Sequence, residues 1–321
     1  MIKFTKGIAV ALLCLWLLPM TAQAKELIPV GQVVGLQLQS GSVTVEGFDA
    51  ELGAAAKEAG LQQGDVLQKV NGRTVRCADD VRQALQKSSG TVAVVYSRGG
   101  KTGTCRVKPH ITADGPKLGV YLRQGITGIG TVTWYDPETG MFATLGHGVS
   151  SSDGKLVTMT EGSAYDARVI KVKKGLSGAP GQLVGSIAGD KPVGSLTKNT
   201  ARGVFGKTDR AWNLSPMEVA EAGEIRTGEA TILSTVDDGG VREYSVEILK
   251  IYPKSRQNGR NMLIHVTDEA LLESTGGIVQ GMSGSPIIQD GKLVGAVTHV
   301  LVNDPTTGYG IFIENMLDAA A

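Results

Sequence analysis

Glycine occurs throughout this chain, at 44 of its 321 residues, and it separates short runs of apolar and β-branched residues. Such runs occur at residues 130–135, 230–236 and 244–251, whereas aromatic residues make up only 5% of the chain. Many glycines with few aromatics favour short strands and tight turns over a helical bundle. Many short strands at regular spacing are typical of a sandwich or barrel. We therefore predict a mainly β chain.

The overall composition is that of an ordinary folded protein, with 41% hydrophobic and 20% charged residues. The length of 321 residues allows about two domains of roughly 100–200 residues each. The formal net charge is only +1, which gives no basic surplus for binding nucleic acid. No metal or other cofactor is expected, because two isolated cysteines supply too few ligands for a metal site.

The first 24 residues have the pattern of a targeting segment. Lys3 and Lys6 precede an apolar run at residues 8–18, and Ala22 and Ala24 form the small-x-small pattern that a signal peptidase reads. The run is shorter than the roughly 20 apolar residues of a transmembrane helix. We predict a signal peptide at residues 1–24 and export of the chain. The alternative is an uncleaved N-terminal anchor.

Two cysteines remain after this segment, Cys77 and Cys105. An even pair in an exported domain can form a disulfide, which is therefore predicted as possible here. The alternative is two buried free thiols.

Residues 25–110 combine short strands with helical signals. Helices are predicted at residues 54–59 and 78–87, and a strand at 65–70 ends in an Asn-Gly turn. The run at residues 59–67, Ala-Gly-Leu-Gln-Gln-Gly-Asp-Val-Leu, followed by Val-Asn-Gly at 70–72, resembles a PDZ domain.

The PDZ resemblance implies a site for an extended peptide. Residues 31–38 resemble the loop in which PDZ domains hold a peptide's terminal carboxylate on backbone N–H groups. The peptide-binding residues are then Gly31, Val34, Gly35 and Leu36, and the ligand adds as a strand to an open edge. The alternative is that this domain only packs on its neighbour.

Residues 111–321 are predicted to form one all-β domain of two packed barrels. Its sharpest motif is Gly-Met-Ser-Gly-Ser-Pro at residues 281–286, which resembles the nucleophile motif of chymotrypsin-like serine peptidases. A serine needs a neighbouring base to act as a nucleophile at neutral pH. The resemblance makes Ser283 the nucleophile and the N–H groups of Gly281 and Ser283 the oxyanion hole. The alternative is a glycine-serine turn without catalytic function.

His147 is the best candidate for the general base among four histidines. It lies between two glycines after the apolar run at residues 143–145, and it precedes the serine as in chymotrypsin-like peptidases. The spacing of the sequence leaves the third member open among four aspartates: Asp153, Asp166, Asp190 and Asp268. Any of them could instead stabilise a turn or cap a helix.

The domain as a whole resembles the stage IV sporulation protein B family of PDZ-containing serine endopeptidases. The resemblance is carried by residues 128–137, 145–149, 266–286 and 298–310. Transferred by position, it implies that His147, Ser283 and Asp268 form the catalytic triad. Asp268 lies closer to the serine in sequence than the acid of chymotrypsin-like enzymes does.

The family resemblance also implies a biological function. Such peptidases are exported into the space between the forespore and mother-cell membranes. They cleave themselves near the N-terminus and cut a membrane-bound regulatory protein, which leads to activation of a sporulation sigma factor. The expected partners are thus a membrane-associated protein substrate and the chain's own N-terminal segment. The alternatives are a catalytically silent PDZ scaffold and an esterase.

Overall fold

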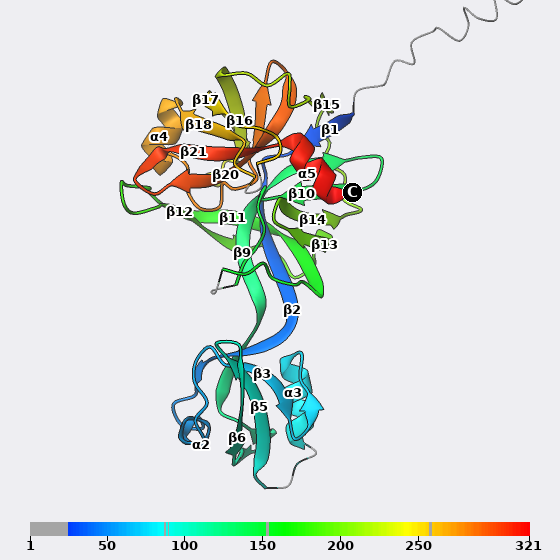
Figure 1. Cartoon of the computed structure of the whole chain (residues 1–321), viewed down its shortest axis with the longest axis vertical. Coiled ribbons are helices and arrows are strands. Elements are labelled where there is room, and N and C mark those ends of the chain that lie inside the picture. Colours follow the sequence, from blue (N-terminus) through cyan, green and yellow to red (C-terminus); the bar gives the residue numbers. More distant parts are fainter. Residues whose placement is uncertain (1–24, 87, 89, 152–153, 257–258) are drawn as a thin grey trace, which may run out of the picture.

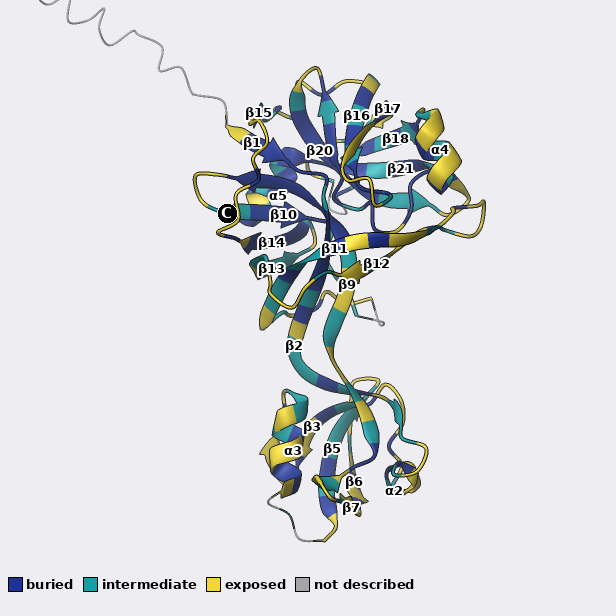
Figure 2. Ribbon diagram, turned by 180° about the vertical axis from the view of Figure 1, so that it is seen from behind, coloured by how far each residue is buried: buried dark blue, intermediate teal, exposed yellow. Residues whose placement is uncertain are grey.

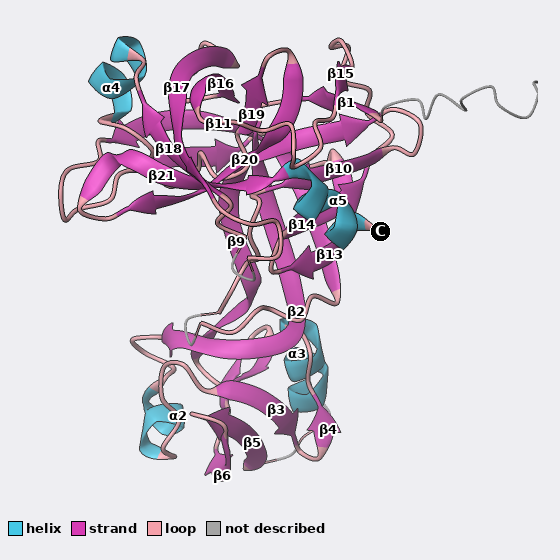
Figure 3. Ribbon diagram, turned by 45° about the horizontal axis from the view of Figure 1, so that its top comes forward, coloured by secondary structure: helices cyan, strands magenta, loops and turns pink. Residues whose placement is uncertain are grey.

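The computed structural model describes residues 25–321 except 87, 89, 152–153 and 257–258. The predicted signal peptide at residues 1–24 lies outside the described residues. Strands dominate the described part of the chain, and the longer helices lie at its periphery (Figure 3). The prediction of a mainly β chain is confirmed.

The first barrel is a ring of six strands in the order β9-β10-β14-β13-β11-β2, closed by pairing between β2 and β9. The strands of this barrel and those beside it are β1 (Glu26–Pro29), β2 (Val33–Phe48), β9 (Val120–Asp136), β10 (Met141–Thr144), β11 (Glu161–Lys173), β12 (Gln182–Ile187), β13 (Gly194–Thr200), β14 (Gly203–Lys207) and β15 (Met217–Glu218). Val34, Leu36 and Phe142 are among the apolar side chains that fill the barrel.

The second barrel is closed in the order β16-β17-β18-β21-β20-β19. Its elements are β16 (Gly228–Ser234), β17 (Arg242–Ile251), β18 (Met262–Val266), α4 (Glu269–Thr275), β19 (Pro286–Gln289), β20 (Lys292–Leu301), β21 (Asp304–Phe312) and α5 (Ile313–Ala320). Alternating residues of β18, Met262, Ile264 and Val266, are fully buried, as expected for one face of a barrel strand. The two barrels confirm the predicted architecture of the peptidase domain.

A smaller PDZ-like body lies below the two barrels in the view of Figure 1. Its elements are α2 (Ala54–Glu58), β3 (Val66–Val70), β4 (Arg73–Thr74), α3 (Ala78–Gln86), β5 (Val92–Arg98), β6 (Lys101–Val107), β7 (His110–Thr112) and β8 (Gly115–Lys117). Its separate core includes Val43, Leu67 and Val94, and α3 buries Val81 and Leu85 against it. Both predicted helices are present with ends close to those expected.

Two long strands join this body to the barrels. β2 and β9 pair with each other from Val33–Thr131 to Phe48–Val120, with register shifts, and run continuously between the two bodies (Figures 1 and 2). The first half of β2 pairs with β11 of the first barrel, and its second half pairs with β3. The PDZ-like body is thus an insertion between β2 and β9. The predicted division into residues 25–110 and 111–321 assigns residues 33–38 to the PDZ-like domain, whereas their strand partners, β9 and β11, belong to the first barrel.

Cys77 and Cys105 are free thiols, so the possible disulfide is not formed. Cys105 points into the PDZ-like core from β6, and burial raises the pKa of its thiol. Cys77 instead lies just before α3, beside the carboxylate of Asp80. The described residues contain no helix long and apolar enough to span a membrane.

Candidate active site

Ser283 lies in the tight turn that precedes β19. The turn needs glycine after the serine, because Gly284 has a φ of +99° and a Cβ there would lie 2.1 Å from the carbonyl oxygen of Thr131. The Ser283 hydroxyl donates a hydrogen bond to the carbonyl oxygen of Thr298, 2.8 Å away on β20. The turn thus holds the serine against the second barrel's strand β20.

His147 follows β10 of the first barrel. The chain turns before it at Leu145, whose φ of +71° is uncommon for a residue with a large side chain. The Nδ1 atom of His147 lies 3.0 Å from the carbonyl oxygen of Gly148. A carbonyl can only accept, so Nδ1 carries the hydrogen and Nε2 is left as the acceptor. This is the tautomer that a general base beside a serine requires.

Burial lowers the pKa of His147, and its hydrogen bond to Gly148 opposes this only in part. The imidazole is therefore neutral at pH 7 and can accept a proton. Among the described residues, no carboxylate shifts the pKa of His147 and none hydrogen bonds to its ring.

His299 and the residue before it on β20 contact the two candidate catalytic residues. His299 follows Thr298, the acceptor of the Ser283 hydrogen bond, and its ring centroid lies 5.1 Å from that of His147 with the planes tilted by 42°. Burial, together with the charges of His147 and Arg260, lowers the pKa of His299 to about 4. Its Nδ1 atom is buried and has no hydrogen-bond partner among the described residues.

The predicted oxyanion hole consists of two backbone N–H groups of the same turn, those of Gly281 and Ser283. No hydrogen bond from the N–H of Gly281 or Ser283 to a protein acceptor occurs in the described part of the chain. The peptide unit that carries the Gly281 N–H is held through the carbonyl of Gln280, which accepts from the N–H of Leu183 at 2.8 Å. Both donors therefore remain free to bind a negatively charged oxygen.

Asp268, the acid implied by the family resemblance, caps a helix in this structure. One carboxylate oxygen accepts from the N–H of Leu271 at 2.9 Å, and the other accepts from the N–H of Ser245 at 3.3 Å. Asp166 forms an ion pair with Arg210, and Asp190 is exposed. Asp153 lies outside the described residues. In the structure Ser283 and His147 thus contact neighbouring residues of β20. Asp268 as the third member of the catalytic triad stays a prediction.

The predicted peptide-binding loop of the PDZ-like domain is wrong. Val34 and Leu36 are buried in the first barrel, and residues 34–36 pair with β9 on one edge and β11 on the other. Gly31 packs against Leu233 of the second barrel, and Gly35 packs against Ile187. A strand paired on both edges has no open edge for a peptide.

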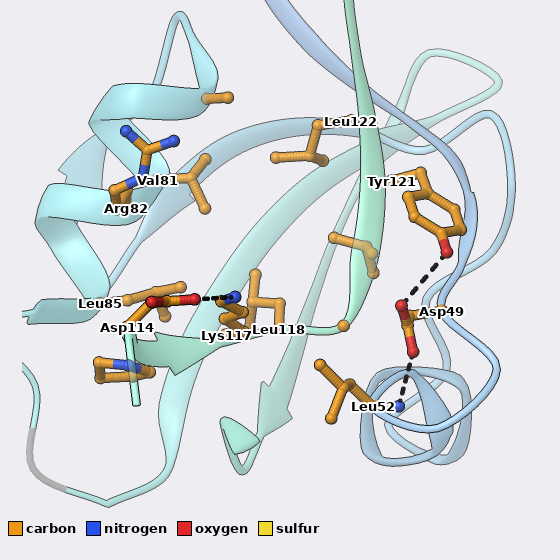
Figure 4. A pocket seen from close by; sticks show the side chains of 14 residues that line it. Asp49, Leu52, Val81, Arg82, Leu85, Asp114, Lys117, Leu118, Tyr121 and Leu122 are labelled. Atoms are coloured by element: carbon orange, nitrogen blue, oxygen red, sulfur yellow. Dashed lines mark hydrogen bonds and ion pairs between the residues drawn. The ribbon is translucent and has the colours of Figure 1, made fainter. Parts of the chain in front are cut away.

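The groove of the PDZ-like body lies elsewhere, between α3 and the start of β9 (Figure 4). It has a volume of about 500 Å³ and is lined mainly by apolar side chains, with charged groups at its rim. The lining includes Leu52, Val81, Leu85, Leu118, Leu122 and Tyr121. Residues 120–124 of β9 pair with β2 on one edge, and no described strand pairs with their other edge. The sequence signal that could have placed the peptide-binding loop at this groove is Leu-Gly-Val at residues 118–120. Residues 31–38 carry a similar short pattern, so the pattern alone does not distinguish the two segments.

The site combines a serine, a neutral imidazole of suitable tautomer and two free backbone donors. This set can perform acyl transfer. The described residues contain no group of three or more histidine, cysteine, aspartate or glutamate side chains that could hold a metal ion.

Comparison with solved structures finds distant likenesses. The chain is 16% identical to the active form of the Rv3671c protease from M. tuberculosis, with 61% of this chain and 73% of that chain covered and a TM-score of 0.36. It is 14% identical to the HtrA-type protease AlgW with a bound tripeptide, with coverages of 60% and 54% and a TM-score of 0.36. The PDZ domain of an SdrC-like protein from Listeria monocytogenes is 23% identical, with coverages of 25% and 85% and a TM-score of 0.22.

Comparison with protein families is more informative. A search of curated proteins finds no match. A PDZ domain model matches residues 49–95, and the model of the SpoIVB peptidase S55 family matches residues 114–317, which is more than half of the chain. The second match includes both His147 and Ser283. The chain therefore belongs to the SpoIVB peptidase S55 family and is a serine peptidase.

Proposed function

We propose that this serine peptidase is exported, cleaves itself near its N-terminus and cuts a membrane-associated regulatory protein in a sporulation pathway that activates a sigma factor. The family assignment supports the pathway, because the family takes its name from a sporulation protein. The targeting pattern at residues 1–24 supports export into the space between the forespore and mother-cell membranes.

The observation that carries the enzymatic part is that Ser283 contacts Thr298 and His147 contacts His299, which are consecutive residues of β20. The Ser283 oxygen attacks the carbonyl carbon of a peptide bond, and its proton passes to Nε2 of His147. The N–H groups of Gly281 and Ser283 stabilise the resulting oxyanion. His147 then returns the proton to the leaving amine, and water hydrolyses the acyl-enzyme by the same route.

In the structure the Ser283 hydroxyl donates its hydrogen to the carbonyl oxygen of Thr298. This hydrogen must be redirected toward Nε2 of His147 before attack. No carboxylate of the described residues is in place to stabilise the imidazolium that forms when His147 accepts the proton. In triad enzymes a carboxylate at this position raises kcat by about 10⁴. Substrate binding that brings an acid to His147 would therefore raise activity strongly.

The groove of the PDZ-like body is the proposed recognition site for an extended segment of the protein substrate or of the chain's own N-terminus. The free edge of β9 at residues 120–124 can pair with such a segment, and the apolar lining of the groove can take its side chains. β9 then continues into the first barrel as far as Asp136, past the turn that holds Ser283.

Self-cleavage tests the proposal directly. The wild-type chain and Ser283→Ala are purified and incubated side by side, and their intact masses are followed over time. We expect the wild type to shorten near its N-terminus while Ser283→Ala keeps its mass. The hydrogen bond from Ser283 to Thr298 is the observation that favours the second candidate, a catalytically silent PDZ scaffold. That candidate takes first place if neither chain shortens and neither reacts with a fluorophosphonate.

A further inference from the structure

Thr131, on β9, contacts the nucleophile turn and the histidine strand at the same time. Its N–H donates to the carbonyl oxygen of Ser283 at 3.0 Å, and its hydroxyl donates to the carbonyl oxygen of Gly281 at 2.9 Å. Its own carbonyl oxygen accepts from the N–H of Leu145, two residues before His147, at 3.4 Å. The side chain is fully buried, and nothing in the mechanism above uses it.

The two hydrogen bonds to the turn lie on either side of the Ser283 N–H. That N–H belongs to the peptide unit between Met282 and Ser283, whose carbonyl accepts from the N–H of Ser285 at 2.9 Å. The neighbouring peptide units carry the carbonyls of Gly281 and Ser283, and Thr131 holds both. Thr131 thus fixes the peptide units on both sides of the Ser283 donor, and the Gly281 carbonyl that it binds belongs to the residue whose N–H is the other donor of the oxyanion hole.

We infer that Thr131 is a positioning residue that sets the oxyanion hole through its hydroxyl group. This inference rests on the proposed peptidase mechanism. Without the hydroxyl, the buried carbonyl of Gly281 loses its side-chain donor, and the peptide unit can rotate toward another partner. Because a misplacement of about 1 Å in a catalytic group can cost about a hundredfold in rate, a small rotation here is enough to weaken catalysis.

The chain supplies a matched control at Thr133. It lies two residues further along the same strand and is fully buried like Thr131. Its hydroxyl, however, has no hydrogen-bond partner among the described residues. Replacing either threonine by valine exchanges a hydroxyl for a methyl group of similar size. Only the change at Thr131 removes a hydrogen bond to the nucleophile turn.

The experiment measures covalent labelling of Ser283 by a fluorophosphonate, whose phosphoryl oxygen occupies the oxyanion hole after attack. The rate of labelling as a function of probe concentration separates the maximal rate, kinact, from the binding constant, KI. We expect Thr131→Val to lower kinact by about ten- to hundredfold and to leave KI nearly unchanged. Thr133→Val and Thr131→Ser, which keeps the hydroxyl, should both label like the wild type.

The outcomes distinguish this inference from the mechanism on which it rests. If the wild type is not labelled at all, the proposed peptidase mechanism fails, and the inference fails with it. If the wild type is labelled and Thr131→Val has the same kinact, only the inference is overturned. Should Thr131→Val fail to fold, Thr131→Ser decides: wild-type kinact supports the hydroxyl's role, and a kinact about tenfold lower despite the hydroxyl overturns it.

Discussion

His299 makes the free energy of unfolding of this chain depend on pH. Its pKa in the folded chain is about 4, because the ring is largely buried and lies beside His147 and Arg260. A histidine in the unfolded chain has a pKa of about 6.5. The unfolded state therefore binds more protons between these values, and stability falls as the pH falls from 6.5 to about 4.

The size of this effect follows from the two pKa values. At pH 4.5 the unfolded histidine is almost fully protonated, whereas the folded one is mostly neutral. The difference corresponds to about 2–3 kcal/mol of lost stability relative to pH 7.5, and partial exposure of the ring reduces it to about 2 kcal/mol. His299→Gln removes the titrating group and should therefore lose about 2 kcal/mol less than the wild type over this range.

Equilibrium urea unfolding at pH 7.5 and pH 4.5 measures the difference. Carboxylates that titrate in this range affect the wild type and His299→Gln equally, so the comparison isolates the histidine. His110→Gln is the matched control, because His110 is exposed in β7. The reasoning is refuted if wild type and His299→Gln lose the same stability on acidification to within about 0.5 kcal/mol.

Three further predictions follow from the site and the groove. Because burial lowers the pKa of His147, the acid limb of kcat/KM should have its midpoint below pH 6.5; a midpoint at or above 6.5 contradicts this. Asparagine also caps helices well, so the contacts of Asp268 predict that Asp268→Asn keeps fluorophosphonate labelling near the wild-type rate, while Asp268→Ala lowers the free energy of unfolding by about 1 kcal/mol. A fall of about 10⁴ in Asp268→Asn would instead show that this carboxylate reaches His147 in the working enzyme, as the family resemblance implies. A charge in the apolar groove, Leu52→Glu, should slow self-cleavage by about tenfold or more without changing fluorophosphonate labelling, and equal slowing of both would exclude a separate recognition role.

Local signals in the sequence predicted the two helices of the PDZ-like body and the nucleophile turn well. The helix at Ala78–Gln86 follows from apolar residues at helical spacing, and the turn around Ser283 follows from its glycines. The insertion of the PDZ-like body was not predictable, because it depends on pairing between residues 33–38 and 126–131, far apart in the chain. A strand's apolar residues do not show which distant strand will pair with it.

The same distinction applies to the site. Ser283 and His147 each lie in a recognisable local motif, whereas Thr131 contacts Gly281 across 150 residues and carries no signal of its own. Residues 31–38 resemble a peptide-binding loop, but a similar short pattern occurs at residues 118–120, and only strand pairing shows which of the two has a free edge. The identity of the triad's acid stays open because Asp268 precedes a helix. This local context favours a capping role for its carboxylate, and the structure shows that role.

The most direct test of the central claim is to identify the residue that a fluorophosphonate modifies in the wild-type chain. Mass spectrometry of a digest is compared among wild type, Ser283→Ala and His147→Ala. The account predicts a single adduct on Ser283 in the wild type, no adduct in Ser283→Ala, and labelling of His147→Ala slower by about a thousandfold or more, because the base is lost. An adduct on another residue, or equal labelling of His147→Ala and wild type, would contradict the assignment of Ser283 as a nucleophile activated by His147.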